Sequence, residues 1–99
     1  MPLSADRKKQ YRTLGHNLKP VVTIAGNGLS ETVINELNRA LDDHELIKVK
    51  LVVADRDLRK QVINEMSKTV KSEIVQEIGK VALIYREAKR PNLKLSNVR

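Results

Sequence analysis

The first thirty residues combine a helical pattern with a short β-branched run. Ser4 is a natural N-cap for a helix over residues 5–17, and Pro20 prevents its continuation. Residues 21–24 are all β-branched and predict a buried strand, which the glycine-containing residues 25–28 interrupt. We expect the helix to have one apolar side, formed by Tyr11, Leu14 and Leu18.

The middle of the chain has a second helix and a strand with clearer periodicity. Ser30 is a natural N-cap, and apolar positions recur after it at helical spacing: Val33, Ile34, Leu37, Ala40 and Leu41. Residues 46–53 alternate in polarity, because Lys48 and Lys50 fall between Ile47, Val49, Leu51 and Val53. This strand should therefore have one apolar face and one partly cationic face.

A third helix and a hairpin complete the pattern. Asp55 is a natural N-cap, and the helix after it should bury Leu58, Val62, Ile63, Met66 and Val70. Residues 73–78 and 81–86 form two strands around Gly79-Lys80, where glycine at the first central position suits a type II′ turn.

The element order predicts an α/β fold of the form αβαβαββ. Right-handed crossovers make the first three strands parallel, and the hairpin adds an antiparallel fourth, which gives a four-stranded mixed sheet packed by helices. We assign residues 1–86 to one domain. Residues 87–99 contain Pro91, few large apolar residues and four basic residues, so we expect a basic, flexible tail.

The charge distribution indicates a polyanionic partner. The net charge is +7, and residues 1–30 and 86–99 each hold five basic residues and one acidic residue, whereas the middle is almost neutral. Phosphate neutralisation releases counterions and drives binding to such segments. There is no cysteine, no apolar run of membrane-spanning length and no apolar stretch at the charged N-terminus. We expect a cytoplasmic monomer with no cofactor and no membrane contact.

The segment 25–30 joins a strand to a helix N-terminus, where free amides and the helix dipole favour an anion. It matches neither a Walker A loop nor a dinucleotide fingerprint. We expect loop amides from Gly26 to Leu29 to meet a phosphate, with Ala25 beside them. Nearby charge should come from Lys19, Lys48, Lys50, Arg56, Arg59, Lys60 and Arg86.

Two other function classes fit parts of the sequence. Asp42, Asp43, His44 and Glu45 are the most catalytic-looking cluster, and the first three would suit a small metal-dependent nuclease, although consecutive residues rarely point at one ion. The basic ends would alternatively suit an adaptor that docks on an acidic protein. Tyr11 and Tyr85 are the only aromatic residues, which disfavours stacking of extended single strands and favours folded RNA as the partner.

Four motifs in order carry a resemblance to a known family. They are Leu18-Lys19-Pro20-Val21-Val22, Asn27-Gly28-Leu29-Ser30, the strand from His44 to Lys50, and Gln76-Glu77-Ile78-Gly79-Lys80 leading to Tyr85-Arg86. Over residues 3–86 the chain resembles the CRM domain (chloroplast RNA splicing and ribosome maturation) in its bacterial stand-alone, YhbY-like form.

The resemblance implies a fold similar to the C-terminal domain of bacterial translation initiation factor three, together with RNA binding. It further implies association with precursors of the large ribosomal subunit, whereas plant relatives act in group II intron splicing. The family's GxxG loop falls on Ala25, Gly26, Asn27 and Gly28, with Ala25 in place of the first glycine. If that position requires a positive φ, alanine imposes a steric cost and Gly26 must supply the missing freedom.

Overall fold

The computed structural model describes residues 3–25 and 28–99, which form three helices and one sheet. In chain order the elements are α1 (Ala5–Gly15), β1 (Pro20–Ile24), α2 (Glu31–His44), β2 (Leu46–Leu51), α3 (Arg56–Thr69), β3 (Glu73–Ile78) and β4 (Val81–Tyr85). The predicted order αβαβαββ is therefore confirmed, with element ends that differ by a few residues. None of the helices in the described part is both long and apolar enough to cross a membrane.

The sheet is mixed and has the strand order β1-β2-β4-β3. β1 runs parallel to β2, and β4 runs antiparallel to both β2 and β3. The first three strands thus share one direction, as the crossover argument predicts, and β4 lies between β2 and β3. Gly79 has a φ of +55° and Ile78 pairs with Val81, which confirms the two-residue hairpin turn.

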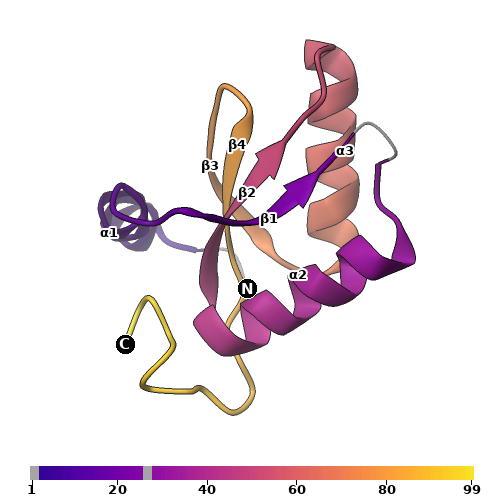
Figure 1. Ribbon diagram of the computed structural model, residues 1–99. Coiled ribbons are helices and arrows are strands. Elements are labelled where there is room, and N and C mark those ends of the chain that lie inside the picture. Colours follow the sequence, from indigo (N-terminus) through magenta and orange to yellow (C-terminus); the bar gives the residue numbers. More distant parts are fainter. Residues whose placement is uncertain (1–2, 26–27) are drawn as a thin grey trace.

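The sheet separates α1 from the other two helices, so the fold has three layers (Figure 1). The larger core lies between the sheet and α2 and α3. Its fully buried members include Ile24, Leu37, Leu41, Val49, Leu51, Met66 and Ile84. Leu58 was expected in this core but is 48% exposed. It continues the line of Val62 by one helical turn, but it lies in the first turn of α3, beyond the region where the helix packs on the sheet.

The smaller core lies between α1 and the opposite face of the sheet, around Tyr11, Leu83 and Tyr85. The two tyrosine rings are 4.8 Å apart, and burial raises the pKa of Tyr85 to about 12. Gly15 lets the helix approach closely, because a Cβ there would lie 2.6 Å from Leu83 Cδ2. Tyr85 is thus part of the core and is not exposed for base stacking.

The C-terminal residues 87–99 differ from the loose tail that the sequence predicts. Ala88 is buried, and its amide donates to Glu45 Oε2 at 2.9 Å. Ser96 Oγ and Arg99 Nε donate to the other carboxylate oxygen, Oε1, at 2.9 and 2.6 Å. Glu45 is fully buried and has a φ of +63°. Charged and polar residues of this segment therefore bind a carboxylate inside the domain, contacts that the expectation of a flexible tail does not include.

Candidate nucleic-acid interface

Three connections meet at the edge of the sheet where β1, β2 and β3 end (Figure 1). Val52 N donates to Ile24 O at 2.8 Å, which joins the ends of β1 and β2. Leu51 N donates to Lys80 O at 2.7 Å, which brings the β3–β4 turn to the same place. We call this region the loop edge, which comprises residues 25, 28–30, 50–60 and 79–80.

The β1–α2 loop contributes to the loop edge an open backbone position with a positive φ. Gly28 has a φ of +76°, and its amide donates to Ala25 O at 3.0 Å. A Cβ added to Gly28 would meet no atom within 4 Å, so the backbone is accessible there. Ala25 is not among the described residues with positive φ, so its side chain carries no such strain. The predicted contacts at Gly26 and Asn27 lie outside the described residues.

Two helices begin at the loop edge, and their caps differ in charge. Ser30 Oγ accepts from Val33 N at 3.2 Å at the start of α2. Asp55 Oδ1 accepts from the amides of Asp57 and Leu58, at 2.8 and 3.1 Å, at the start of α3. Both first turns contain an acidic residue, Glu31 in α2 and Asp57 in α3, but only α3 also has a carboxylate as its cap, whereas a neutral hydroxyl caps α2. The start of α2, next to Gly28 and Leu29, is therefore the better place for a phosphate.

Cationic side chains from three elements lie at the loop edge, the same edge of the sheet as the β1–α2 loop. Lys50 is exposed at the end of β2, Arg56 and Lys60 are exposed on α3, and Lys80 is exposed in the β3–β4 turn. Arg59 is half-buried and donates from Nη1 to Val53 O at 2.9 Å. In the described part of the chain, ion pairs involve only Arg86 and Arg99, so the cations of the loop edge have no carboxylate partner.

A hollow of about 260 Å³ separates the first turns of α3 from the β3–β4 turn. Arg56, Arg59 and Lys60 line one side of it, and Glu77 and Gly79 line the other, so one carboxylate lies opposite the three cations. Sequence reasoning did not assign Lys80 to the site. The available signal was that β3 must run parallel to β1 and β2, which places the turn after β3 at the same edge.

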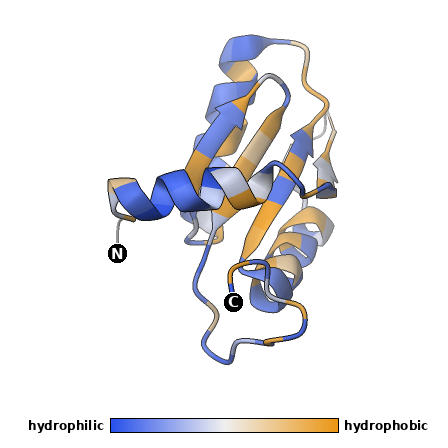
Figure 2. Ribbon diagram, turned by 90° about the vertical axis from the view of Figure 1, so that its left-hand side faces the viewer, coloured by the Kyte–Doolittle hydropathy of each residue, from blue (hydrophilic) through white to orange (hydrophobic). Residues whose placement is uncertain are grey.

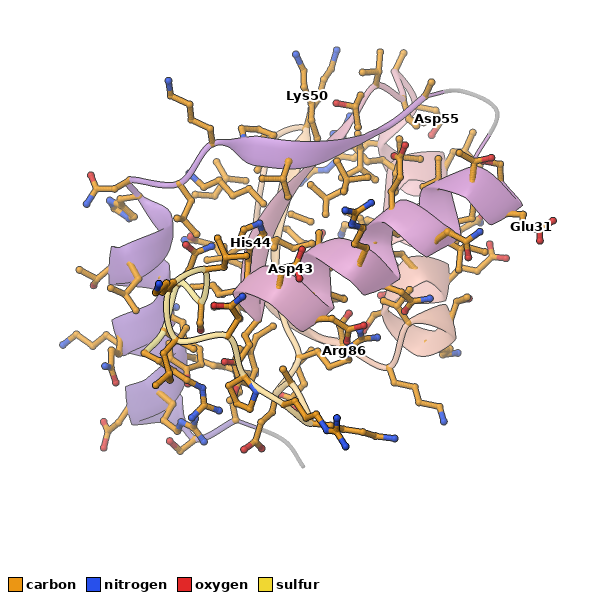
Figure 3. The ribbon with its side chains drawn as sticks, turned by 60° about the horizontal axis from the view of Figure 1, so that its bottom comes forward. Glu31, Asp43, His44, Lys50, Asp55 and Arg86 are labelled. Carbon is orange, nitrogen blue, oxygen red and sulfur yellow. The ribbon has the colours of Figure 1, made fainter. Side chains whose placement is uncertain are left out.

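Lys48 and Lys50 alternate with Ile47 and Val49 along β2, so they point to the face of the sheet on which α1 packs. Figure 2 shows α1 crossing only part of this face. Lys19 precedes β1, whose first residue Pro20 pairs with Lys48, and Lys19 and Lys48 line one shallow hollow. Lys19, Lys48 and Lys50 therefore continue the positive charge of the loop edge across this open part of the sheet. Figure 3 shows the Lys50 side chain extending away from the ribbon.

Arg86 does not belong to this surface, contrary to the sequence prediction. It lies beside α2, away from Lys50 and Asp55 (Figure 3). Its Nη1 donates to Asn38 Oδ1 and Val70 O, both at 2.8 Å. Its Nη2 donates to Asn38 O at 3.0 Å and to Asp42 Oδ1 at 2.8 Å. The guanidinium links the ends of α2 and α3 and has a structural role.

The cluster that suggested a nuclease has structural partners instead. Asp42 forms the ion pair with Arg86, and His44 Nδ1 lies 2.8 Å from Leu95 O. Glu45 is buried against Arg99. Within residues 3–25 and 28–99, no three acidic or histidine side chains converge as a metal site would require.

Comparison with known proteins places the chain among named relatives. It is 52% identical over 98 residues to a Pseudomonas aeruginosa protein named "Probable RNA-binding protein", covering 99% of this chain and 94% of the relative. It is 41% identical over 93 residues to a Haemophilus influenzae protein named "RNA-binding protein", covering 94% of each chain.

The fold is similar to the solution structure of a Staphylococcus aureus protein, with a TM-score of 0.79 and 35% identity over 90% of this chain and 93% of that one. The family model of the CRS1 / YhbY (CRM) domain matches residues 3–86, the same span that carries the sequence resemblance. The chain therefore belongs to the CRS1 / YhbY (CRM) domain family.

Proposed function

We propose that this protein binds folded RNA without catalysing a reaction on it, and that its RNA is ribosomal RNA in precursors of the large ribosomal subunit. The loop edge would hold the RNA backbone, and the lysines of the open sheet face would extend the contact. The observation that carries this proposal is the set of cations without carboxylate partners, from β2, α3 and the β3–β4 turn, at the same edge of the sheet as the accessible glycine loop.

Two further observations support the proposal. The relatives from Pseudomonas aeruginosa and Haemophilus influenzae are both named for RNA binding. Backbone recognition also suits the composition, because the buried tyrosines leave no aromatic platform for stacking among the described residues. Of the three residues that would support hydrolysis, Asp42, Asp43 and His44, the first and last already have partners in the fold.

The direct test is RNA binding by paired charge variants. The double variant R56Q/K60Q removes two positive charges from the loop edge. K68Q/K89Q removes two exposed charges elsewhere, one of them in the last turn of α3. We expect the first variant to bind a fragment of large-subunit ribosomal RNA at least about tenfold more weakly, and the second to differ little from wild type. Equal losses would mean that net charge alone governs binding.

The remaining parts of the proposal need separate experiments. The RNA should stay intact after incubation with the protein and Mg²⁺ or Mn²⁺, whereas cleavage that H44A abolishes would favour the nuclease. In a fractionated cell extract, the protein should leave large-subunit precursors after nuclease digestion. An adaptor held by an acidic protein would stay in its complex. Light scattering of the free protein should give the mass of a monomer.

A further inference from the structure

The face of the sheet beyond α1 contains a cavity of about 360 Å³, and of its lining residues only Lys48 belongs to the surface proposed to contact the RNA backbone. It exists because α1 ends at Gly15, after which the chain turns away toward β1. The helix covers Leu83 and Tyr85 but leaves the neighbouring parts of β2, β3 and β4 open (Figure 2).

The walls of this cavity are apolar and its rim is polar. Pro20, Ile78, Val81 and Leu83 form the walls, and Ile78 is 61% exposed although it is a large apolar side chain. His16, Gln76 and Lys48 form the rim. None of the side chains that line the cavity is acidic. A concave apolar site with a few polar groups is the usual form of a site for a small organic group.

Charge complementarity identifies the kind of occupant. Lys48 lies at the rim, and Lys50 lies two residues further along the same face of β2, about 7 Å away. A ligand that fits must combine a compact, largely apolar body with negative charge at about this spacing. An unpaired nucleotide has this form, since a base can sit between apolar side chains while its phosphates lie outside. Gln76 and His16 offer hydrogen-bonding groups to the edge of such a base.

We propose that this cavity accepts one unpaired nucleobase of the bound RNA, with the adjoining phosphates on Lys48 and Lys50. This inference rests on the proposed function and adds a preference: the protein should favour RNA with a bulged or looped-out nucleotide over fully paired RNA. Phosphate contacts at the loop edge alone would not discriminate between these two ligands.

The experiment compares one RNA duplex with the same duplex carrying a single bulged nucleotide. We expect wild type to bind the bulged duplex about fivefold more tightly, and I78A to reduce this preference to less than about twofold without weakening binding to the paired duplex. L93A is the matched control, because Leu93 is 73% exposed and lies in the C-terminal segment. Both substitutions shorten an exposed apolar side chain and leave the charge unchanged. A wild type that binds both duplexes equally would overturn the inference.

A second experiment detects ligand binding in the cavity and needs no variant. With methyl-labelled protein, adenosine monophosphate should shift the resonances of Ile78, Val81 and Leu83, and ribose 5-phosphate, which lacks the base, should not. If an acidic peptide with one leucine shifts them while adenosine monophosphate does not, the cavity binds protein.

If R56Q/K60Q weakens both duplexes equally while wild type shows no preference, the loop-edge function stands and the nucleobase inference fails. If R56Q/K60Q binds RNA as wild type does, the loop-edge function itself fails.

Discussion

Glu45 and Arg99 are 54 positions apart in the sequence, yet Arg99 Nε lies 2.6 Å from Glu45 Oε1. The carboxylate is fully buried, so it depends on the C-terminal segment for its positive partner. We predict that R99A lowers the free energy of unfolding by about 1–3 kcal/mol, because a hydrogen-bonded charge pair at a buried carboxylate is lost. Chemical denaturation measures this, and R90A, which changes an exposed arginine of the same segment, should have little effect. Similar loss in both variants would contradict the specific role of Glu45.

The Glu45–Arg99 pair also makes the stability of the fold depend on pH. The pKa of Glu45 is lowered from its ordinary value, chiefly by the hydrogen bond from Arg99, and burial opposes this effect. A lowered pKa contributes stability that is complete above the ordinary value of 4.5 and is lost as pH falls from there through the folded-state pKa. We expect E45Q to be less stable than wild type at pH 7, and the difference to shrink below pH 4.5. Thermal melts across this range test it; a constant difference would contradict it.

Arg86 supplies a prediction that separates stability from binding. Its four hydrogen bonds satisfy acceptors near the ends of α2 and α3, and lysine cannot reproduce that planar arrangement of donors. We expect R86K to lower the free energy of unfolding by about 2–4 kcal/mol while the folded fraction binds RNA as wild type does. Binding measured well below the unfolding temperature provides the comparison. A loss of RNA affinity without a loss of stability would mean that Arg86 contacts the RNA.

Gly28 allows a matched test of the glycine loop. At its φ of +76°, any side chain is strained, and asparagine and aspartate are almost the same size. G28N and G28D should therefore both lose about 0.5–1 kcal/mol of stability. Only G28D places a negative charge where we propose a phosphate, so only G28D should bind RNA more weakly. If both variants bind equally well, the loop is only a turn.

Salt dependence counts the phosphates that the surface neutralises. About five contacts predict a slope of roughly −3.5 to −4.5 for log K against log of the salt concentration. The double variant K50Q/K80Q should make this slope shallower by about 1.4–1.8, since each lysine releases counterions from one phosphate. Titrations at several salt concentrations measure the slope. An unchanged slope would show that neither lysine contacts the backbone.

Local sequence patterns predicted the helices and strands, because helix capping and turn formation depend on residues that are close in the sequence. The caps Ser4, Ser30 and Asp55 each satisfy amides within a few residues, and the hairpin depends on Gly79. The crossover rules also make β1 and β2 parallel, so Lys50 at the end of β2 lies at the same edge as the β1–α2 loop. These parts of the fold and of the candidate site follow from periodicity and crossover rules.

Contacts between distant segments were not predictable in this way. Arg86 and Arg99 read as surface charge because their partners, Asp42 and Glu45, are more than forty positions away in an acidic run. The extent of the sheet face that α1 leaves uncovered depends on where α1 crosses the sheet. The packing of Gly15 against Leu83 determines that position. No local pattern contains that information.

The position of β4 in the sheet has a consequence for how the chain folds. β4 is the last strand in the sequence, yet it lies between β2 and β3 and is the only strand that pairs with both. During synthesis, β1 and β2 can pair as soon as β2 is complete, but β2 keeps an open edge until residue 85 has emerged. Because the pairing of β2 with β4 closes late, we expect the sheet to be completed only near the end of synthesis. A chain that stops before residue 81 would expose the edges of β2 and β3 and would be prone to aggregate.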